Sequence, residues 1–366
     1  MDGPFAPTPE PWSSQTPSPP PDLSNLLSIA QQLRCKVVAS RRSTPSLQSV
    51  PEYTEMISGR VIELARSGQG CRTLQREINA MRECHRVRDL ASLASELMYS
   101  SGIFKHVIDD KFANYVVQDL VRALPGDHPV IDAITDAILN YPADVLATSQ
   151  HGSHVIVAVL SQSLSQSGTQ KKRGETLLHA LTQRAASLAK DFHGSQVICF
   201  ALGSMASSKV LLAPLAVRAL DLCLNRHGHK VIQSALTRAS SQALGQFEAC
   251  LRENLPTLLS HEYGAKVVQH VLAKQRMGLN SITHAQAPLY CSQLANERDD
   301  KCLIALANDP VASTLLFQIM ELSYNRKQLL DRLFMSSIDV KQIIQSDQGF
   351  DLINKVLSRF MEQRLN

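Results

Sequence analysis

The stretch Phe112-Ala113-Asn114-Tyr115-Val116-Val117-Gln118 decides how this chain folds. In a helix, Asn114 and Gln118 stand four residues apart on one face, and Tyr115 lies about 100° around the axis from Asn114. Val116 and Val117 then face the other way, toward a core. Amides that donate and accept hydrogen bonds can match the edge of a nucleobase, and an aromatic ring can stack on its flat face.

The same pattern occurs eight times along the chain. Each copy has a small residue, two variable positions, two positions that are apolar with the single exception of Thr73, and an aliphatic residue eight positions after the small one. Consecutive copies are separated by 34 residues (Gly194 to Gly228) to 48 residues (Gly264 to Ala312). Such steps are typical of stacked helical repeats with loops of varying length. The eight copies begin at Gly70, Ala113, Gly152, Gly194, Gly228, Gly264, Ala312 and Gly349.

We expect each copy to be the second helix of a repeat, preceded by another helix, as in 207–223, 242–259 and 326–334. A helix pair of this size cannot bury its apolar faces alone, so neighbouring repeats must stack. The small residue lets the second helix begin in close contact with the turn before it. The sequence therefore predicts an all-α fold, an α-solenoid of about eight helical repeats over residues 51–366, with the second helices side by side on one wall.

Two polar stretches, Ser161 to Gly174 and Gln275 to Pro288, are predicted to be loop insertions. The first contains Lys171-Lys172-Arg173, which we interpret as a solvated basic cluster rather than a nuclear-import signal.

Residues 1–50 are predicted to be a disordered tail and linker, because a segment rich in Pro and Ser buries too little apolar surface to offset its ordering entropy. A brief helix could start at Asp22 and run to Arg34. Trp12, the only tryptophan, is either a solvent-exposed ring or part of a short partner-docking motif.

Composition limits the kinds of partner and the cellular compartment that we expect for this chain. The 366 residues carry a formal net charge of +4, which permits an anionic partner without requiring one. The eight cysteines include no Cys-x-x-Cys pair, so we expect reduced thiols in an intracellular compartment. We find no basic-then-apolar leader and no apolar run near the roughly 18 residues that span a bilayer, so we expect no membrane association.

Catalysis and metal binding are not expected. His151, His193 and His227 each precede the glycine of a copy, and this recurrence indicates a turn or capping role. His151 and His154 stand three apart, but no carboxylate or thiol completes a zinc set. No catalytic triad, phosphate-binding loop or paired-carboxylate pattern is evident, so we predict no enzyme activity, no cofactor and no metal.

Four of the copies resemble repeats of the Pumilio-homology (PUF) family. The segments are Gly70-Cys71-Arg72-Thr73-Leu74-Gln75, Asn114-Tyr115-Val116-Val117-Gln118, His227-Gly228-His229-Lys230-Val231-Ile232-Gln233 and Tyr263-Gly264-Ala265-Lys266-Val267-Val268-Gln269. The resemblance covers residues 53–366. It is close in repeats 1, 2, 5 and 6, keeps the scaffold in repeats 3 and 4, and is remote in repeats 7 and 8.

The resemblance implies a crescent-shaped solenoid whose concave face binds single-stranded RNA, one base per repeat, with the N-terminal repeat at the 3′ end. It also implies a monomeric cytoplasmic protein that binds 3′ untranslated regions of mRNA and regulates translation or stability, with repressor or deadenylase proteins as possible partners on the convex face. Two alternatives stay open: a helical-repeat scaffold that binds protein after losing most RNA readout, and a nucleolar PUF-like protein of ribosome biogenesis, whose relatives usually have more basic faces.

In the family, the first and fifth positions of the five-residue core contact the base edge and the second position stacks between bases. Carried over, Cys71, Arg72 and Gln75 of repeat 1 are similar to adenine readers. Asn114, Tyr115 and Gln118 of repeat 2 match the uracil reader. The resemblance therefore predicts an RNA site that ends in UA at its 3′ side.

The remaining repeats depart from the family pattern. Val157 and Cys199 replace the fifth-position amide in repeats 3 and 4, and we expect Lys230 and Lys266 to contact phosphates in place of a stacking residue. Repeats 7 and 8, with Asp351 at a second position, give no support for the family's 5′ UGU readout. The candidate RNA contacts in repeats 3 to 6 are Ser153, His154, Ser195, Gln196, His229, Lys230, Gln233, Ala265, Lys266 and Gln269.

Overall fold

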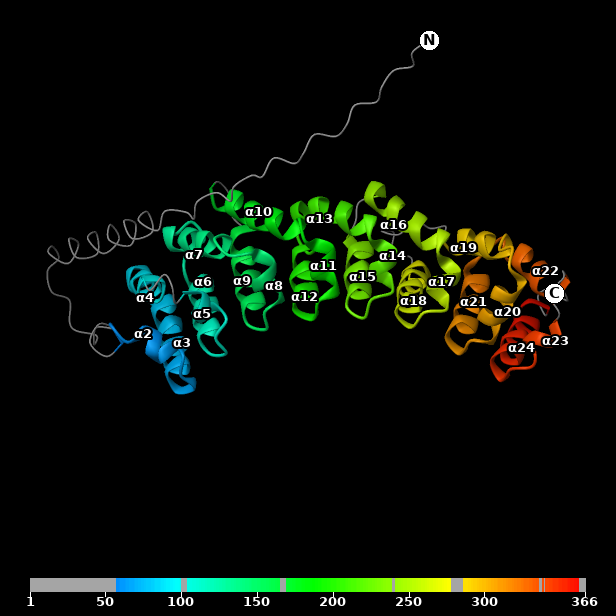
Figure 1. Cartoon of the computed structure of the whole chain (residues 1–366), viewed down its shortest axis with the longest axis horizontal. Helices are drawn as coiled ribbons and strands as arrows, with labels where there is room; N and C mark the ends of the chain where they lie inside the picture. The colour runs from blue at the N-terminus through cyan, green and yellow to red at the C-terminus, as the bar shows by residue number, and fades with distance from the viewer. Residues whose placement is uncertain are drawn as a thin grey trace, which may run out of the picture. The chain divides into compact units, whose positions relative to one another are not determined.

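The computed structural model describes residues 57–99, 104–164, 169–238, 241–277, 286–335, 338 and 340–361. Every regular element in these ranges is a helix (Figure 1), as the sequence predicts. All of them belong to one compact unit, Gln48–Asn366. The tail and linker predicted for residues 1–50, including Trp12 and the brief helix from Asp22, lie outside the described residues.

Each repeat begins with a short first helix, which is followed by a longer second helix that contains one copy of the sequence pattern. The first helices are α2 (Val61–Ala65), α5 (Phe104–Ile108), α8 (Ala143–Thr148), α11 (Ala185–Lys190), α14 (Ala219–Cys223), α17 (Leu255–Leu259), α20 (Asp300–Asn308) and α23 (Val340–Ile343). The second helices are α3 (Gly68–Glu83), α6 (Ala113–Ala123), α9 (Gly152–Leu164), α12 (Phe192–Ala201), α15 (Gly228–Arg238), α18 (Glu262–Arg276), α21 (Pro310–Leu322) and α24 (Asp347–Met361).

A third helix connects each repeat to the next, so two helices rather than the expected one precede each copy after the first. These connecting helices are α4 (Val87–Tyr99), α7 (Pro129–Leu139), α10 (Thr169–Thr182), α13 (Met205–Val217), α16 (Ser241–Glu253), α19 (Gln286–Ala295) and α22 (Arg326–Met335). The segment 207–223, for example, breaks at Arg218 between α13 and α14.

The second helices stand side by side in chain order. Each one contacts the next, from α3 through α6, α9, α12, α15, α18 and α21 to α24. The connecting helices form another row, in which each likewise contacts its successor (Figure 1). The predicted stack of eight repeats with adjacent second helices is therefore confirmed.

The second helices share a local construction at their starts. In seven repeats, the side chain three positions before the small residue accepts a hydrogen bond from that residue's backbone N–H, as Asp191 does from Gly194 (2.7 Å). The absent side chain of the glycine admits a carbonyl of the first helix. A Cβ on Gly264 would lie only 2.6 Å from the Leu258 carbonyl oxygen. The close contact predicted for the small residue is confirmed.

The capping side chain itself was not anticipated. His151, His193 and His227 do lie in the turn, where each donates its backbone N–H to the capping side chain, for example from His193 to Asp191 (2.9 Å). The recurring Ser, Asp or Asn three positions before the small residue is a helix-start signal that the sequence already contained.

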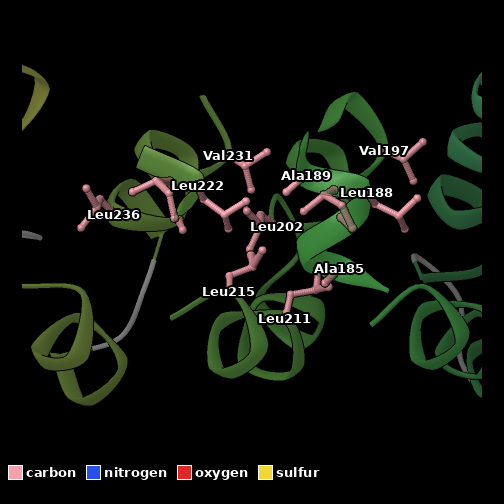
Figure 2. Close-up of a cluster of buried hydrophobic side chains, with 14 of the residues drawn as sticks. Ala185, Leu188, Ala189, Val197, Leu202, Leu211, Leu215, Leu222, Val231 and Leu236 are labelled. Carbon is pink, nitrogen blue, oxygen red and sulfur yellow. The ribbon is translucent and has the colours of Figure 1, made fainter. Parts of the chain in front are cut away.

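The hydrophobic core runs from repeat to repeat rather than closing within each one. Figure 2 shows this between repeats 4 and 5, where Leu188 of α11, Leu215 of α13 and Leu222 of α14 share one buried cluster. Val197 of α12 and Val231 of α15 are fully buried in the same cluster. Fully burying a Val or Leu side chain contributes about 1.5–3 kcal/mol to the free energy of folding. These side chains are buried between two repeats, so the contribution depends on both repeats being present.

The loop predicted over Ser161 to Gly174 is wrong for most of its length. α9 continues to Leu164 and α10 begins at Thr169. Gly174 packs so closely on Ser163 that a Cβ would lie 2.8 Å from the serine Cβ. Arg173, expected to be solvated, reaches the carboxylates of Asp132 (2.6 Å) and Asp136 (3.1 Å) on α7. The polar residues of this segment therefore belong to the connecting helix α10, whose Arg173 pairs with carboxylates of the neighbouring helix α7.

The second predicted insertion, Gln275 to Pro288, is wrong at both ends, because Gln275 belongs to α18 and Pro288 to α19; residues 278–285 lie outside the described ranges. The seven cysteines in the described part of the chain are free, and Cys71, Cys223 and Cys291 are buried. No single described helix is long and apolar enough to cross a membrane. One consecutive pair, α20 and α21, would suffice only together and is bent by 104°.

Candidate nucleic-acid interface

The first, second and fifth positions of the eight copies lie along the row of second helices, and we call this set the readout row. Its second positions are all exposed: Arg72, Tyr115, His154, Gln196, Lys230, Lys266, Thr314 and Asp351. Its first positions are buried in seven repeats: Cys71, Asn114, Ser153, Ser195, His229, Ala265 and Ser313. The predicted site residues are therefore brought together on one surface, with exposed side chains above a buried floor.

Repeat 2 differs from the expectation that two amides are openly displayed. Asn114 is only 1% exposed and Gln118 only 6%, while Tyr115 is 51% exposed. The Gln118 amide N–H donates to Asn114 Oδ1 (2.8 Å), and Asn114 donates to the Asp110 carbonyl (2.7 Å). Arg122 donates to Gln118 Oε1 (3.0 Å). Each amide keeps a second N–H and a second lone pair, so the pair is oriented by its neighbours and still able to bind a base edge.

In repeat 1, the candidate residues Arg72 and Gln75 line an open hollow of about 840 Å³. The Gln75 amide N–H donates to Asp119 of the next repeat (2.7 Å), and Gln75 Oε1 accepts from the Cys71 thiol (3.8 Å). Burial raises the pKa of the Cys71 thiol, with smaller contributions from Asp119 and Asp110. The protonated thiol donates to the Phe112 carbonyl (3.2 Å). The hollow is lined by Gly68, Gln69, Arg72, Gln75, Arg76 and Asn79.

Repeats 3 and 4 present small first-position hydroxyls. Ser195 donates to the Phe192 carbonyl (2.9 Å). Ser153 Oγ is buried and has no hydrogen-bond partner in the described part of the chain. At the fifth position of repeat 4, burial raises the pKa of the Cys199 thiol, which also bonds to the Ser234 hydroxyl. His154 and Gln196 lie exposed above this floor.

Repeats 5 and 6 are joined by an aromatic contact. The His229 ring stacks on Tyr263, with centroids 5.2 Å apart and planes inclined by 14°. The Lys266 ammonium lies over the Tyr263 ring, 5.0 Å from its centroid. It also pairs with the Glu262 carboxylate (2.7 Å). Lys266, expected to meet a phosphate, is thus already paired in this structure. In the same region, Lys230, Ala265 and Gln269 occupy the readout row, with Lys230 and Gln269 exposed and Ala265 buried.

Repeats 7 and 8 give a different surface. Thr314 is exposed and its hydroxyl donates to the Pro310 carbonyl (3.2 Å). Phe350, at the first position of repeat 8, is 55% exposed, and Asp351 pairs with Lys355 (2.6 Å). The polar floor seen in repeats 1 to 5 therefore does not extend through repeat 8.

Rings immediately before the small residue were not recognised as part of the candidate site. Five consecutive repeats have one there: Phe112, His151, His193, His227 and Tyr263. Phe192 contacts both His193 and His227 edge to face, at 4.8 Å and 5.5 Å between centroids. The recurrence of a ring at this position was the available sequence signal. These side chains border the readout row at the N-terminal ends of the second helices.

Comparison with known proteins agrees with this arrangement. Residues 145–156 and 218–245 match the model of the Pumilio-family RNA binding repeat. Pumilio homolog 12 of Arabidopsis thaliana is 21% identical over 282 residues, which is 75% of this chain and 45% of that protein. Suppressor protein MPT5 of Saccharomyces cerevisiae is 23% identical over 225 residues, 58% of this chain and 24% of that protein. The chain thus spans less than half the length of either relative.

Solved structures show the same fold at low sequence identity. The RNA-binding domain of yeast Puf5p bound to AAT2 RNA has a TM-score of 0.64 and 18% identity, covering 81% of this chain and 82% of that one. The Puf3 RNA binding domain bound to a Cox17 RNA 3′ UTR recognition sequence has a TM-score of 0.60 and 18% identity, covering 88% and 90%. PUF-8 in complex with PBE-RNA has a TM-score of 0.61 and 13% identity, covering 90% and 99%.

Proposed function

The chain belongs, by distant homology, to the Pumilio family of RNA-binding repeat proteins, and from this premise we propose that it binds single-stranded RNA along the readout row, one base per repeat. The proposed ligand is a 3′ untranslated region of mRNA, with a site that ends in UA at repeats 2 and 1. Binding there would regulate the translation or stability of the message, in the cytoplasm.

One observation carries this proposal: second positions are exposed in all eight repeats, while the adjacent first positions form a buried and largely polar floor. Exposed side chains that can stack, next to oriented donors and acceptors, are what sequence-specific recognition of single-stranded RNA requires. The continuous row of second helices supplies this pairing once per repeat.

Repeats 1 and 2 are the strongest part of the proposed site. Arg72 and Tyr115 offer a guanidinium plane and a ring for stacking, and such stacks contribute about 1–3 kcal/mol per base. By analogy with bidentate contacts in DNA complexes, each good edge contact discriminates by about 1–3 kcal/mol. In repeats 3 and 4, Val157 and Cys199 provide poorer edge partners than an amide would.

Binding of RNA along the readout row is tested by two alanine substitutions. One replaces an exposed tyrosine on the row, and the other replaces an exposed tyrosine outside it. Tyr115→Ala removes the proposed stacking ring of repeat 2. Tyr324→Ala removes a ring that is 85% exposed and lies between α21 and α22. Fluorescence anisotropy with a labelled single-stranded RNA ending in UA should show weakening by about 1–3 kcal/mol for the first variant and no change for the second. Equal effects of the two substitutions, or equal affinity for a duplex of the same sequence, would count against the proposal.

Regulation of mRNA is tested separately in cells. A reporter mRNA with the UA-ending site in its 3′ untranslated region should change in protein output when this chain is expressed, and a reporter with the UA replaced should not. Because Asn114 and Gln118 are the proposed uracil readers, the response should also be lost on Asn114→Ala with Gln118→Ala. A response that ignores both changes would refute regulation through this site.

A further inference from the structure

The hydrogen bonds of His229 fix which of its ring nitrogens faces the readout row. His229 Nδ1 lies 3.2 Å from the Asn225 carbonyl oxygen. A carbonyl oxygen can only accept, so the proton of the neutral ring is on Nδ1. Stacking on Tyr263 holds the ring plane. In the neutral ring, Nε2 is then the acceptor.

The fifth position of the same repeat is oriented in the same way. The Gln233 amide N–H donates to the Lys266 backbone carbonyl (2.9 Å). Because this partner also can only accept, the amide nitrogen must face it. Gln233 Oε1 is left without a hydrogen-bond partner in the part of the chain that the structure describes. Repeat 5 therefore offers two oriented acceptors, four residues apart on one helical face.

Two neighbouring acceptors select one of the four bases. The Watson–Crick edge of guanine has adjacent donors, N1–H and the N2 amino group. Adenine and cytosine each pair one donor with a neighbouring acceptor, and uracil has one donor between two acceptors. On the basis of the proposed function, we propose that repeat 5 is a guanine reader, with His229 Nε2 and Gln233 Oε1 accepting from guanine N1–H and N2–H. In a register of one base per repeat, this guanine is the fifth nucleotide from the 3′ end.

Repeats 1, 2 and 6 do not offer two acceptors that are both free of protein donors. In repeat 2, Gln118 Oε1 already accepts from Arg122 and Asn114 Oδ1 accepts from Gln118. In repeat 1, the first position is the Cys71 thiol, which donates. In repeat 6, the first position is Ala265, which has no polar side-chain atom. The preference is thus a property of repeat 5 and not of the row in general.

The choice of an imidazole as one acceptor makes the preference depend on pH. Burial lowers the pKa of His229 below its ordinary value of 6.5, the carbonyls of Asn225 and Arg226 oppose this, and the ammonium groups of Lys266 and Lys230 reinforce it. The Glu262 carboxylate and the Tyr263 ring also face this histidine. Above its pKa the ring is neutral and accepts. As pH falls through the pKa, Nε2 gains a proton, and a donor then faces the guanine donors.

The test uses the full chain and four RNA pools of the form 5′-NNNXNNUA-3′, with X set to G, A, C or U. At pH 7.5 the G pool should bind about tenfold or more tighter than the others, the size expected for one good edge contact. His229→Phe keeps a ring against Tyr263 and removes the acceptor, so it should abolish the preference for G. Gln233→Leu should do the same through the other acceptor. The matched control, His179→Phe, changes an exposed imidazole on the connecting helix α10, away from the readout row, and should preserve the preference.

Affinity ratios between pools are compared, because any effect of pH on the charge of the chain as a whole applies to every RNA pool alike. The G:A ratio of the wild-type chain should fall toward one as the pH is lowered from 7.5 through the pKa of His229, which lies below 6.5. Equal affinity for all four pools, with UA-ending RNA still preferred over RNA ending in CC, would refute the guanine assignment and leave the proposed function standing. Absence of binding to any pool would overturn both. A preference for G that persists in both His229→Phe and Gln233→Leu would also refute the assignment.

Discussion

At the scale of single residues, Asn114 and Gln118 show how a readout position is held before any ligand arrives. Their mutual hydrogen bond, the Asp110 carbonyl and the Arg122 guanidinium leave each amide in a single orientation. Because the side chains are already ordered, binding a base costs less side-chain entropy than it would for free amides.

This ordering leads to a prediction about base preference. Asn114→Ser combined with Gln118→Glu should shift the preference of repeat 2 from uracil toward guanine, because a carboxylate offers two acceptors to guanine N1–H and N2–H. Anisotropy with RNAs ending in UA and GA measures the shift, which should approach 1–3 kcal/mol, that is, about 5- to 150-fold. Circular dichroism of the variant controls for folding. If affinity drops equally for all four bases, repeat 2 does not read a base edge.

Lys266 illustrates a residue whose role the sequence could not define alone. Its ammonium is paired with the exposed carboxylate of Glu262. Glu262→Gln should release it to meet a phosphate, so binding should tighten for all RNA sequences and the slope of log K against log salt should steepen by about one charge. Lys266→Ala should weaken binding for all sequences. Salt titrations of both variants provide the measurement. An unchanged slope in both would exclude a phosphate contact at this position.

At the scale of the helical element, six of the described second helices have in their first turn a glycine packed against a carbonyl oxygen of the first helix. Gly264 and Gly245 form a matched pair for testing this. A Cβ at Gly264 would lie 2.6 Å from the Leu258 carbonyl oxygen, whereas a Cβ at Gly245, inside α16, would meet nothing within 4 Å.

Alanine should therefore act in opposite directions at these two sites. Gly264→Ala should lower the free energy of unfolding by about 1–3 kcal/mol through overpacking. Gly245→Ala should raise it by about 0.5–1 kcal/mol, because alanine is the better helix former. Urea denaturation followed by circular dichroism measures both. Destabilisation of similar size at both positions would mean that close approach to the carbonyl is not what requires a small residue.

The sequence predicts the positions of some helices and not of others. The second helices were predictable because the small residue and the paired apolar positions recur with every repeat. The helix at Thr169 was missed because its polar composition fits a loop, and only the folded chain brings Arg173 to Asp132 and Asp136. The division of 207–223 into α13 and α14 was missed because apolar residues continue across the break at Arg218.

At the scale of the whole stack, the candidate site is a product of repeats lying side by side. First positions become a buried floor only when the next second helix covers them, as Tyr263 covers His229. Burial of this kind depends on a partner in the following repeat, so the pattern within one repeat could locate the candidate residues but not their exposure. Phe350 supports this reading, because no described second helix follows α24 and its side chain stays 55% exposed.

The central claim is that the readout row binds single-stranded RNA base by base from its 3′ end. Selection of bound RNAs from a random pool, followed by sequencing, tests this claim most directly. Enriched RNAs should end in UA and carry guanine at the fifth nucleotide from the 3′ end. A pool that stays unchanged in sequence after selection, or one enriched in duplexes, would contradict the claim.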